Sequence, residues 1–331
     1  MDKRALLDAV PKLAGRRVAV IGDLFLDDYI VGRAERLSRE APLPVLEYAR
    51  RFQLPGGACN PAMNIAALGS SAYQVGVVGD DAAGQALLAR LQQAGIDTSH
   101  MVVDPGRRTT TKTRIMAEGT LLYPQQVARV DWMDRAPLGP AFTQKLREHI
   151  QDLAAEVDAF LLSDYKGGVV SEDLIASAVR SAREAGKYIT VDSQGDLHKF
   201  RGFHLLKCNR REAEIAAGHP LNSEEDFEAL GRSLLRDLGA GAVLITRGPE
   251  GMSLIMKKQA HHLPAANRSE VFDVSGAGDT VIAVTTLSLA AGLDLVKAAH
   301  LANYAAGLVV RKMGNATPTP QELAWAIKNW L

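Results

Sequence analysis

The sequence predicts an α/β fold, in which helices cover both faces of a mainly parallel, doubly wound sheet. Three observations lead to this prediction. Short runs rich in β-branched residues alternate along the chain with stretches of helical pattern. Most of these runs end in a charged residue followed by a turn, as expected where strand ends carry a site. Two longer stretches show strand-like alternation without an intervening helix. Alternating strands and helices are typical of parallel sheets.

The predicted elements follow one another in regular order. The runs predicted as buried strands are 16–23, 72–80, 157–164, 187–192 and 241–248. The predicted helices are 61–68, 82–94, 141–155, 172–185 and 224–238. A further apolar run follows Asp279 and predicts a buried helix.

Two stretches depart from this alternation: they cover about residues 28–54 and about residues 108–132. Both alternate with the period of strands, and neither contains a helical pattern between its strands. We expect them to leave the main sheet and form a small antiparallel β lid over its edge. A hairpin without a functional role is the alternative interpretation.

Composition and charge exclude several classes of protein. Lys and Arg together number 38, as do Asp and Glu, so the net charge gives no indication of a nucleic-acid or membrane partner. The longest apolar run, 281–293, is too short to span a bilayer, and no secretory signal is visible at the N-terminus. Cys59 and Cys208 lack metal-ligand spacing, which suits a reducing, cytoplasmic location.

The sequence DVSGAGD, residues 273–279, predicts an anion site. Gly276, Ala277 and Gly278 precede the buried helix, and the amide groups at a helix start are free to bind an anion. The stretch lacks the third glycine of a dinucleotide fingerprint, and no P-loop motif occurs in the chain. Asp279 could accept a proton from an attacking hydroxyl group, or it could be favoured there only by the helix dipole. Spacing alone does not separate these two interpretations.

A second glycine-rich stretch is PGGACNPAMNIAALG, residues 55–69. Gly56 and Gly57 would let a ligand approach the backbone closely, and Asn60 offers both a donor and an acceptor to a sugar hydroxyl. A tight turn without a ligand is the alternative.

Together, the two glycine-rich stretches resemble the signatures of the ribokinase-like (PfkB) carbohydrate kinases. The resemblance also covers GDLFLDDY at 22–29, NRRE at 209–212 and TRG at 246–248, and so extends over nearly the whole chain. It implies a three-layer α/β/α fold, a single kinase domain over 1–331, and ATP and Mg²⁺ as co-substrate and metal. It further implies K⁺ near the anion site and a homodimer formed through the lids.

Within this family, four stretches look like those of the D-glycero-β-D-manno-heptose 7-phosphate kinases. They are RLSREAPLPVLE, PGGACNPAMNIAALG, LLSDYKGGV and VFDVSGAGDTVIAV. The implied reaction is phosphorylation of the anomeric O1 to the 1,7-bisphosphate, on the route to ADP-heptose and the lipopolysaccharide inner core. The chain would be the stand-alone form, without the adenylyltransferase domain. Ser275 replaces a usual threonine, VDSQGD stands in place of Asp-Pro-Lys-Gly, and LKCN stands in place of Thr-Pro-Asn.

Other functions stay open beside this one. A kinase of another sugar or sugar phosphate would carry the same motifs, because lid residues set the substrate. A sugar- or nucleotide-binding regulator without turnover is disfavoured by the intact Asp279 and its glycines. A nicotinamide-dependent dehydrogenase is disfavoured by the missing third glycine.

The resemblance assigns a role to each candidate residue. Asp279 is the expected general base, and Gly276, Ala277 and Gly278 form the anion hole. Candidates for binding nucleotide are Asn209, Glu212, Thr246, Arg247, Gly248 and Asn303. Glu212 is also the candidate ligand of Mg²⁺, through water. Candidates for binding the sugar are Asp23, Asp27, Gly56, Gly57 and Asn60. The substrate's own phosphate requires cations, for which Lys166, Lys112 and Arg114 are the candidates; each could equally be a solvated surface charge.

Overall fold

The computed structural model describes residues 2–119, 124–267, 271 and 273–330. The predicted lid segment 108–132 therefore lies in part, at 120–123, outside the described residues. The main sheet has the strand order β13-β12-β11-β10-β9-β8-β1-β4-β5. Its strands are β1 (Arg17–Gly22), β4 (Ser71–Gly79), β5 (Met101–Asp104), β8 (Ala159–Asp164), β9 (Tyr188–Ser193), β10 (Leu205–Asn209), β11 (Ala242–Thr246), β12 (Met252–Met256) and β13 (Ala260–Leu263).

The strands from β11 to β5 are parallel to their neighbours, whereas β12 and β13 add an antiparallel edge. Alternate residues of β1 point to opposite faces: Val18 and Val20 pack in one core cluster, and Ala19 and Ile21 in the other. A strand that is buried on both faces needs a nearly continuous apolar sequence, as the VAVI of β1 shows.

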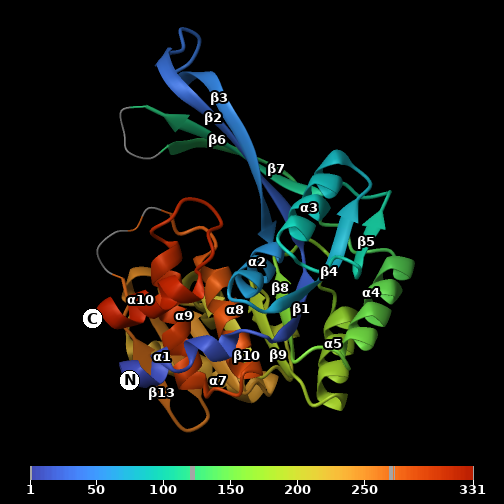
Figure 1. Ribbon diagram of the computed structural model, residues 1–331, viewed down its shortest axis with the longest axis vertical. Helices are drawn as coiled ribbons and strands as arrows, with labels where there is room; N and C mark the ends of the chain where they lie inside the picture. The colour runs from blue at the N-terminus through green and yellow to red at the C-terminus, as the bar shows by residue number, and fades with distance from the viewer. Residues whose placement is uncertain (1, 120–123, 268–270, 272, 331) are drawn as a thin grey trace.

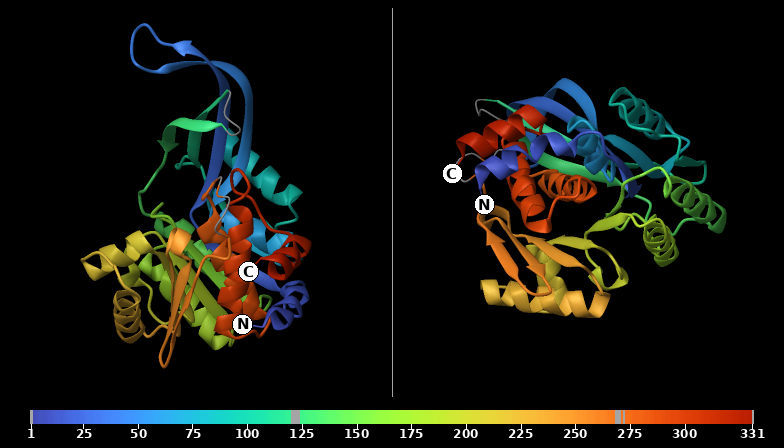
Figure 2. Two further views of the ribbon diagram at one scale, coloured as in Figure 1. Left: turned by 90° about the vertical axis from the view of Figure 1, so that its left-hand side faces the viewer. Right: turned by 60° about the horizontal axis from the view of Figure 1, so that its bottom comes forward.

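Helices cover both faces of this sheet, which gives the predicted three layers (Figures 1 and 2). The helices packed in the first core cluster are α1 (Lys3–Leu7), η1 (Val10–Leu13), α2 (Cys59–Ala67), α3 (Ala82–Gln93), α8 (Ala277–Ala290), α9 (Leu295–Val309) and α10 (Pro320–Asn329). Those in the second are α4 (Pro140–Leu153), α5 (Glu172–Glu184), α6 (Arg210–Ala217) and α7 (Glu224–Leu238). Short 3₁₀ turns, η2 (Leu197–Lys199) and η3 (Gly248–Glu250), lie in the connections. The mainly parallel, doubly wound fold class is thereby confirmed.

A separate sheet of four strands projects from the body as the lid (Figure 1). Its order is β3-β2-β6-β7, with β2 (Leu24–Leu37), β3 (Pro44–Gly57), β6 (Thr110–Glu118) and β7 (Gln125–Trp132). The β2–β3 and β6–β7 pairs are antiparallel, as expected, but the central β2–β6 pair is parallel. The reason is that β2 and β6 come from different parts of the chain, and no hairpin connects them.

The lid is joined directly to the main sheet. Only Asp23 separates β1 from β2, and β3 runs into the turn before α2. No helix in the described part of the chain combines the length and apolar character needed to cross a bilayer.

Candidate active site

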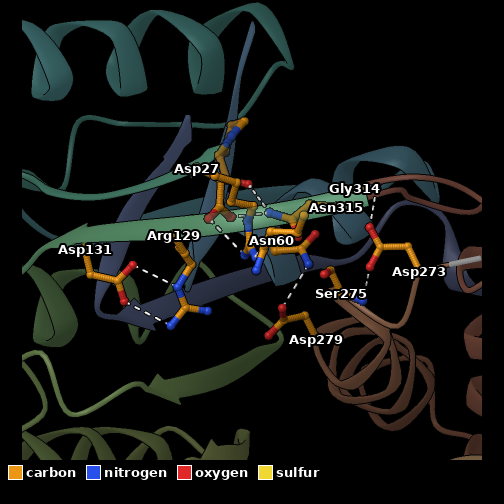
Figure 3. A network of polar contacts seen from close by, with 12 residues as sticks. Asp27, Asn60, Arg129, Asp131, Asp273, Ser275, Asp279, Gly314 and Asn315 are labelled. Atoms are coloured by element: carbon orange, nitrogen blue, oxygen red, sulfur yellow. Dashed lines mark hydrogen bonds and ion pairs between the residues drawn. The ribbon is translucent and has the colours of Figure 1, made fainter. Parts of the chain in front are cut away.

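Asp279 lies in the first turn of α8, at the carboxyl ends of the central strands. The helix begins after Gly276, whose φ of 75° is left-handed and therefore favours glycine. The Asp279 side chain is buried, and both of its oxygens accept hydrogen bonds. Asn60 Nδ2 donates to Oδ2 over 2.9 Å (Figure 3), and the Tyr165 hydroxyl donates to Oδ1 over 2.7 Å. The two glycine-rich stretches of the sequence therefore meet at this carboxylate.

The environment of Asp279 raises its pKa to about 6. Burial is the largest cause, because it disfavours the charged form, and the nearby Asp192 carboxylate adds repulsion. The hydrogen bonds from Tyr165 and Asn60 act in the opposite direction, since they stabilise the ionised form. A carboxylate with a pKa near 6 is ionised at neutral pH and is still basic enough to take a proton.

The glycines beside Asp279 are needed for space as well as for backbone conformation. A Cβ atom added to Gly276 would lie 2.4 Å from Asn60 Nδ2, and one added to Gly278 would lie 2.6 Å from Lys207 Nζ. Ala277 is the first helical residue between them. The amide groups of this first turn are among those that an α-helix leaves without a partner inside the helix. The turn can therefore bind an anion beside the carboxylate.

Asp27 lies on β2 and is buried at the base of the lid. Its Oδ2 accepts a 2.7 Å hydrogen bond from Asn315, and its Oδ1 a 3.3 Å bond from Arg114 (Figure 3 shows the Asn315 contact). A Cβ atom at Gly56 would lie 2.2 Å from Asp27 Oδ2, so only glycine fits there. Asn315 was not among the predicted site residues.

Asp23 has a different environment from Asp27. Its carboxylate accepts hydrogen bonds from the backbone N–H groups of Tyr165, Gly167 and Val169, over 2.8, 2.9 and 3.1 Å. Burial raises the pKa of Asp23, and these donors oppose the rise. The structure thus places Asp23 as an anchor of the loop after β8. Gly57 adjoins it, since a Cβ atom there would lie 2.4 Å from the Asp23 carbonyl oxygen.

The lid carries cations on the strands beside Asp27. Lys112 Nζ lies 4.0 Å from the centre of the Phe25 ring, and burial lowers the pKa of Lys112. Arg114 on β6 is the direct cross-strand neighbour of Arg129 on β7, and Lys112 that of Asp131. Arg129 also forms a 2.9 Å ion pair with Asp131, drawn as dashed lines in Figure 3. Arg129 was missed at the level of sequence; its register opposite Arg114 is what reveals it.

Lys166 follows β8 and is exposed. Its φ of 59° is left-handed, and among the described non-glycine residues no other has a positive φ. Its backbone N–H donates to Asp164 Oδ1 over 3.0 Å. The side chain reaches the loop after β9, because a Cβ atom on Gly195 would lie 2.1 Å from Lys166 Nζ.

Two predicted nucleotide residues form a capping box at the start of α6. Asn209 Oδ1 accepts from the Glu212 N–H over 2.9 Å, while the Glu212 carboxylate accepts from the backbone and side-chain amides of Asn209, over 2.7 Å each. Burial raises the pKa of Glu212. Asn303 on α9 lies apart from them, where its side chain bonds the main chain of residues 264–266.

The other nucleotide candidates lie at the end of β11. Thr246 closes the strand, and Gly248 is left-handed with open space around its Cα atom. The Arg247 side chain is buried and turns toward α7, where its guanidinium lies 5.4 Å from the centre of the Phe227 ring. Because the Arg247 guanidinium is occupied by these contacts within the body of the protein, a nucleotide bound here would meet the main chain of Arg247 and not its side chain.

The described residues form no cluster of three or more acidic, histidine or cysteine side chains that would enclose Mg²⁺. Both carboxylate oxygens of Glu212, the predicted Mg²⁺ ligand, accept hydrogen bonds from Asn209. The Asp273 carboxylate, which lies near the predicted K⁺ site, accepts from the N–H groups of Ser275 and Gly314, each over 2.9 Å (Figure 3). The turn before α8 and the segment after α9 are therefore held together.

Comparison with known proteins agrees with this geometry. The model of the pfkB family of carbohydrate kinases matches residues 16–322. The bifunctional protein HldE of Paramagnetospirillum magneticum is 42% identical over 325 residues, which cover 98% of this chain and 65% of that protein. HldE of Trichlorobacter lovleyi is 39% identical over 329 residues, covering 99% and 66%. The chain thus spans about two thirds of the length of these relatives.

Solved structures show the same fold at low sequence identity. Phosphofructokinase-2 from Escherichia coli, in its tetrameric inhibited form, superposes with a TM-score of 0.78 at 18% identity, over 95% of this chain and 98% of that one. The same enzyme in complex with potassium has a TM-score of 0.77 at 17% identity, over 95% and 98%. Ribokinase of Arabidopsis thaliana complexed with ribose and ATP has a TM-score of 0.73 at 18% identity, over 95% and 99%.

The family match covers most of the chain, and its two glycine-rich signatures meet at Asp279 in the structure. The predicted ribokinase-like fold and the prediction of an ATP-dependent sugar kinase are confirmed at the level of the family. The chain belongs to the pfkB family of carbohydrate kinases.

Proposed function

We propose that the protein transfers the γ-phosphoryl group of ATP to the anomeric O1 of D-glycero-β-D-manno-heptose 7-phosphate. The observation that carries the proposal is the buried Asp279 carboxylate, with a pKa of about 6, at the anion-binding start of α8. The sugar oxygen forms a bond to Pγ while the bond from Pγ to the β–γ bridging oxygen breaks. ADP keeps that electron pair, and the hydroxyl proton passes to Asp279.

The first turn of α8 stabilises the charge that develops in this step. Amide groups around Gly276, Ala277 and Gly278 would face the γ-phosphoryl oxygens, where fixed donors are most effective in a site that excludes water. The strand ends at Asn209 and Thr246 would lie along the other phosphates, and Asn303 would wall the adenine. Mg²⁺ would neutralise the phosphate charge, held mainly by ATP and water and faced by Glu212.

The cations of the lid support a phosphorylated sugar as the acceptor. Arg114 and Arg129 are direct cross-strand neighbours; Asp27 and Asp131 pair with them, and two guanidinium groups side by side still offer donors to a dianionic phosphate. Lys112 adds a third cation on β6. Asp27 and Asn60 would bind sugar hydroxyls, with Gly56 allowing close approach. The sequence resemblance and the relatives named HldE support a heptose phosphate as this sugar.

The proposal includes one kinase domain, a homodimer and a monovalent cation. Large apolar side chains exposed on the lid strands and the loop between β2 and β3 support pairing of two lids: Leu37, Leu43, Tyr48, Val127, Val130 and Trp132. A related fold, phosphofructokinase-2, is known in complex with potassium, and we place the K⁺ of this protein near Asp273, as the sequence resemblance implies. Two buried free thiols, Cys59 and Cys208, suit a cytoplasmic enzyme.

An ADP-release assay with a panel of sugars tests the proposal. We expect rapid release with heptose 7-phosphate, slow release with ribose or fructose 6-phosphate, and loss of activity when Mg²⁺ is chelated. Faster turnover of another sugar would replace the substrate while keeping the reaction. Sugar binding without ADP release from any sugar would instead identify a non-catalytic regulator. Full activity in buffer free of K⁺ and Na⁺ would remove the monovalent cation from the proposal.

A further inference from the structure

A buried ion pair lies directly beneath the anion-binding turn. Lys207 on β10 and Asp192 on β9 are register partners in neighbouring parallel strands. The Lys207 ammonium donates a 2.7 Å hydrogen bond to Asp192 Oδ2, and both side chains are buried. A buried ion pair adds little to stability by itself, because desolvation offsets the attraction between the charges. Its presence at this place therefore calls for a reason other than stability.

The position of the ammonium relative to Gly278 suggests that reason. Of all the atoms that a Cβ on Gly278 would meet, Lys207 Nζ is the nearest, at 2.6 Å. The ammonium thus lies against the turn whose amide groups face the anion site. Within the described residues it makes one hydrogen bond, to Asp192, although an ammonium carries three N–H donors. The remaining donors are free to bind a ligand that enters beside Gly278.

The charges around this turn make a cation necessary. Asp192, Glu212 and Asp279 all lie close enough to act on Lys207, so an incoming phosphoryl group would meet three acidic side chains. Burial would lower the pKa of Lys207, but these carboxylates raise it, and the side chain stays an ammonium at neutral pH. During transfer, negative charge is spread over the three peripheral oxygens of the γ-phosphoryl group. A fixed ammonium beside Gly278 offsets both the repulsion and this charge.

We infer that Lys207 is a further catalytic residue, whose ammonium contacts a peripheral oxygen of the γ-phosphoryl group. Asp192 is its positioning residue, because it holds the ammonium against Gly278. The inference rests on the phosphoryl transfer proposed above, but not on the identity of the sugar.

Nucleotide binding in the absence of sugar tests the inference. Calorimetry would measure Mg²⁺-ADP and the Mg²⁺ complex of the β,γ-imido analogue of ATP on wild type and on Lys207→Met. Loss of a charge-assisted contact to the γ-phosphoryl group should weaken the analogue by roughly 10–150-fold and leave ADP within about threefold. Turnover with the best sugar of the panel should fall on the order of 10²–10³-fold.

Two further variants keep the result interpretable. Lys199→Met is the matched control, because Lys199 forms an equally short 2.7 Å pair with buried Asp164, away from Gly278. It should change ADP and the analogue by the same factor. If Lys207→Met does not fold, the double variant Asp192→Asn, Lys207→Met removes both charges together, and the same selective loss is expected.

Two outcomes would overturn the inference. One is equal weakening of ADP and the analogue, which would show a structural role for the pair. The other is a folded variant that binds both nucleotides and turns over as wild type does. A different preferred sugar would change the proposed substrate without touching either binding constant, so the two proposals fail separately.

Discussion

The Tyr165 hydroxyl donates a 2.7 Å hydrogen bond to Asp279 Oδ1, so the proposed base is held by a residue from the loop after β8. Burial, together with the Asp279 charge, raises the pKa of Tyr165 well above its usual value, and its proton stays in place. The Tyr165 ring also packs edge-on against Phe25 of the lid, at 4.9 Å between centroids. Tyr165 thus connects the lid to the carboxylate.

Removing this hydroxyl should shift the pH dependence of the reaction. The hydrogen bond favours the ionised form of Asp279 and lowers its pKa, so Tyr165→Phe should raise that pKa. The acid limb of the kcat/KM profile is expected near pH 6 in wild type. It should move upward by roughly one pH unit, because the free energy of one hydrogen bond to a charged group corresponds to about that change in pKa. Tyr188→Phe is the control, because Tyr188 is the first residue of β9 and lies at the end of the strand away from the site. It should leave the acid limb in place. An unchanged limb in Tyr165→Phe would separate Tyr165 from the base.

Replacing Asp279 by Asn should abolish most of the turnover. Loss of a positioned general base typically lowers the rate on the order of 10²–10⁴-fold. ATP affinity should stay close to that of wild type, because the amide groups of the turn remain. Turnover within a few-fold of wild type would contradict the role of Asp279.

The same variant should be more stable than wild type at high pH. The native pKa of Asp279 is about 6, above the ordinary value of 3.8, so the native state binds more protons than the unfolded state between about pH 4 and 6. Ionisation of Asp279 therefore lowers the free energy of unfolding of wild type as the pH rises through that window. The cost approaches about 3 kcal/mol above pH 6 as an upper limit. Denaturant unfolding should show Asp279→Asn gaining stability over wild type from pH 4 to pH 8; a constant difference would refute the shifted pKa.

Lys166 should affect the phosphorylated sugar more than ATP. Lys166→Ala should raise KM for the sugar phosphate, with a loss in kcat/KM of roughly 10–150-fold for one charge-assisted contact. Lys166→Gly should show the same loss in kcat/KM as Lys166→Ala. Its free energy of unfolding should be about 1 kcal/mol higher than that of wild type, because glycine adopts the left-handed φ of 59° without steric strain. Lys145→Ala, exposed on α4, is the control. A stable Lys166→Ala that uses the sugar phosphate as wild type does would identify a surface lysine.

The lids should hold two subunits together. Leu37 is 70% exposed and Tyr48 is 67% exposed, values that are unfavourable for large apolar side chains on strands unless a partner covers them. Light scattering at micromolar concentration should show a dimer for wild type and a monomer for Leu37→Glu, Tyr48→Glu. Ile215→Glu, 66% exposed on α6 in the body, should remain dimeric. A monomeric wild type would reject the dimer.

The sequence predicted the parts of the fold that depend on local pattern. The five predicted strands and five predicted helices are present, with ends displaced by at most about two residues as is usual for boundaries, and the buried helix predicted after Asp279 is α8. Strand β10 was not predicted, since Lys207 interrupts its apolar run. The edge strands β12 and β13 were not predicted either, because they are short. Helix α9 was missed because it is largely buried and alanine-rich, without a clear polar face.

The site was predictable only where a motif marks it. Asp279 and Asn60 stand in glycine-rich stretches, and the structure joins them. Tyr165 stands in LLSDYKGGV, where the sequence assigned a role only to Lys166, and Asn315 stands in none of the motifs; their partners lie 114 and 288 positions away in the chain. A hydrogen bond between residues so far apart leaves no local pattern. Register between β6 and β7 likewise determines the place of Arg129 and cannot be read from composition.

The bond between Asn60 and Asp279 joins positions 219 residues apart, so the order of synthesis limits when the site can form. A chain emerging from the ribosome can complete the lid hairpins and the first strands early, because their partners are close in sequence. The Asp279 carboxylate is made 219 residues after Asn60. Until α8 has been made, α2 lacks the surface on which it packs. Its apolar side chains stay exposed during that time and can be bound by chaperones. Assembly of the site would therefore follow, and not precede, the formation of the N-terminal part of the fold.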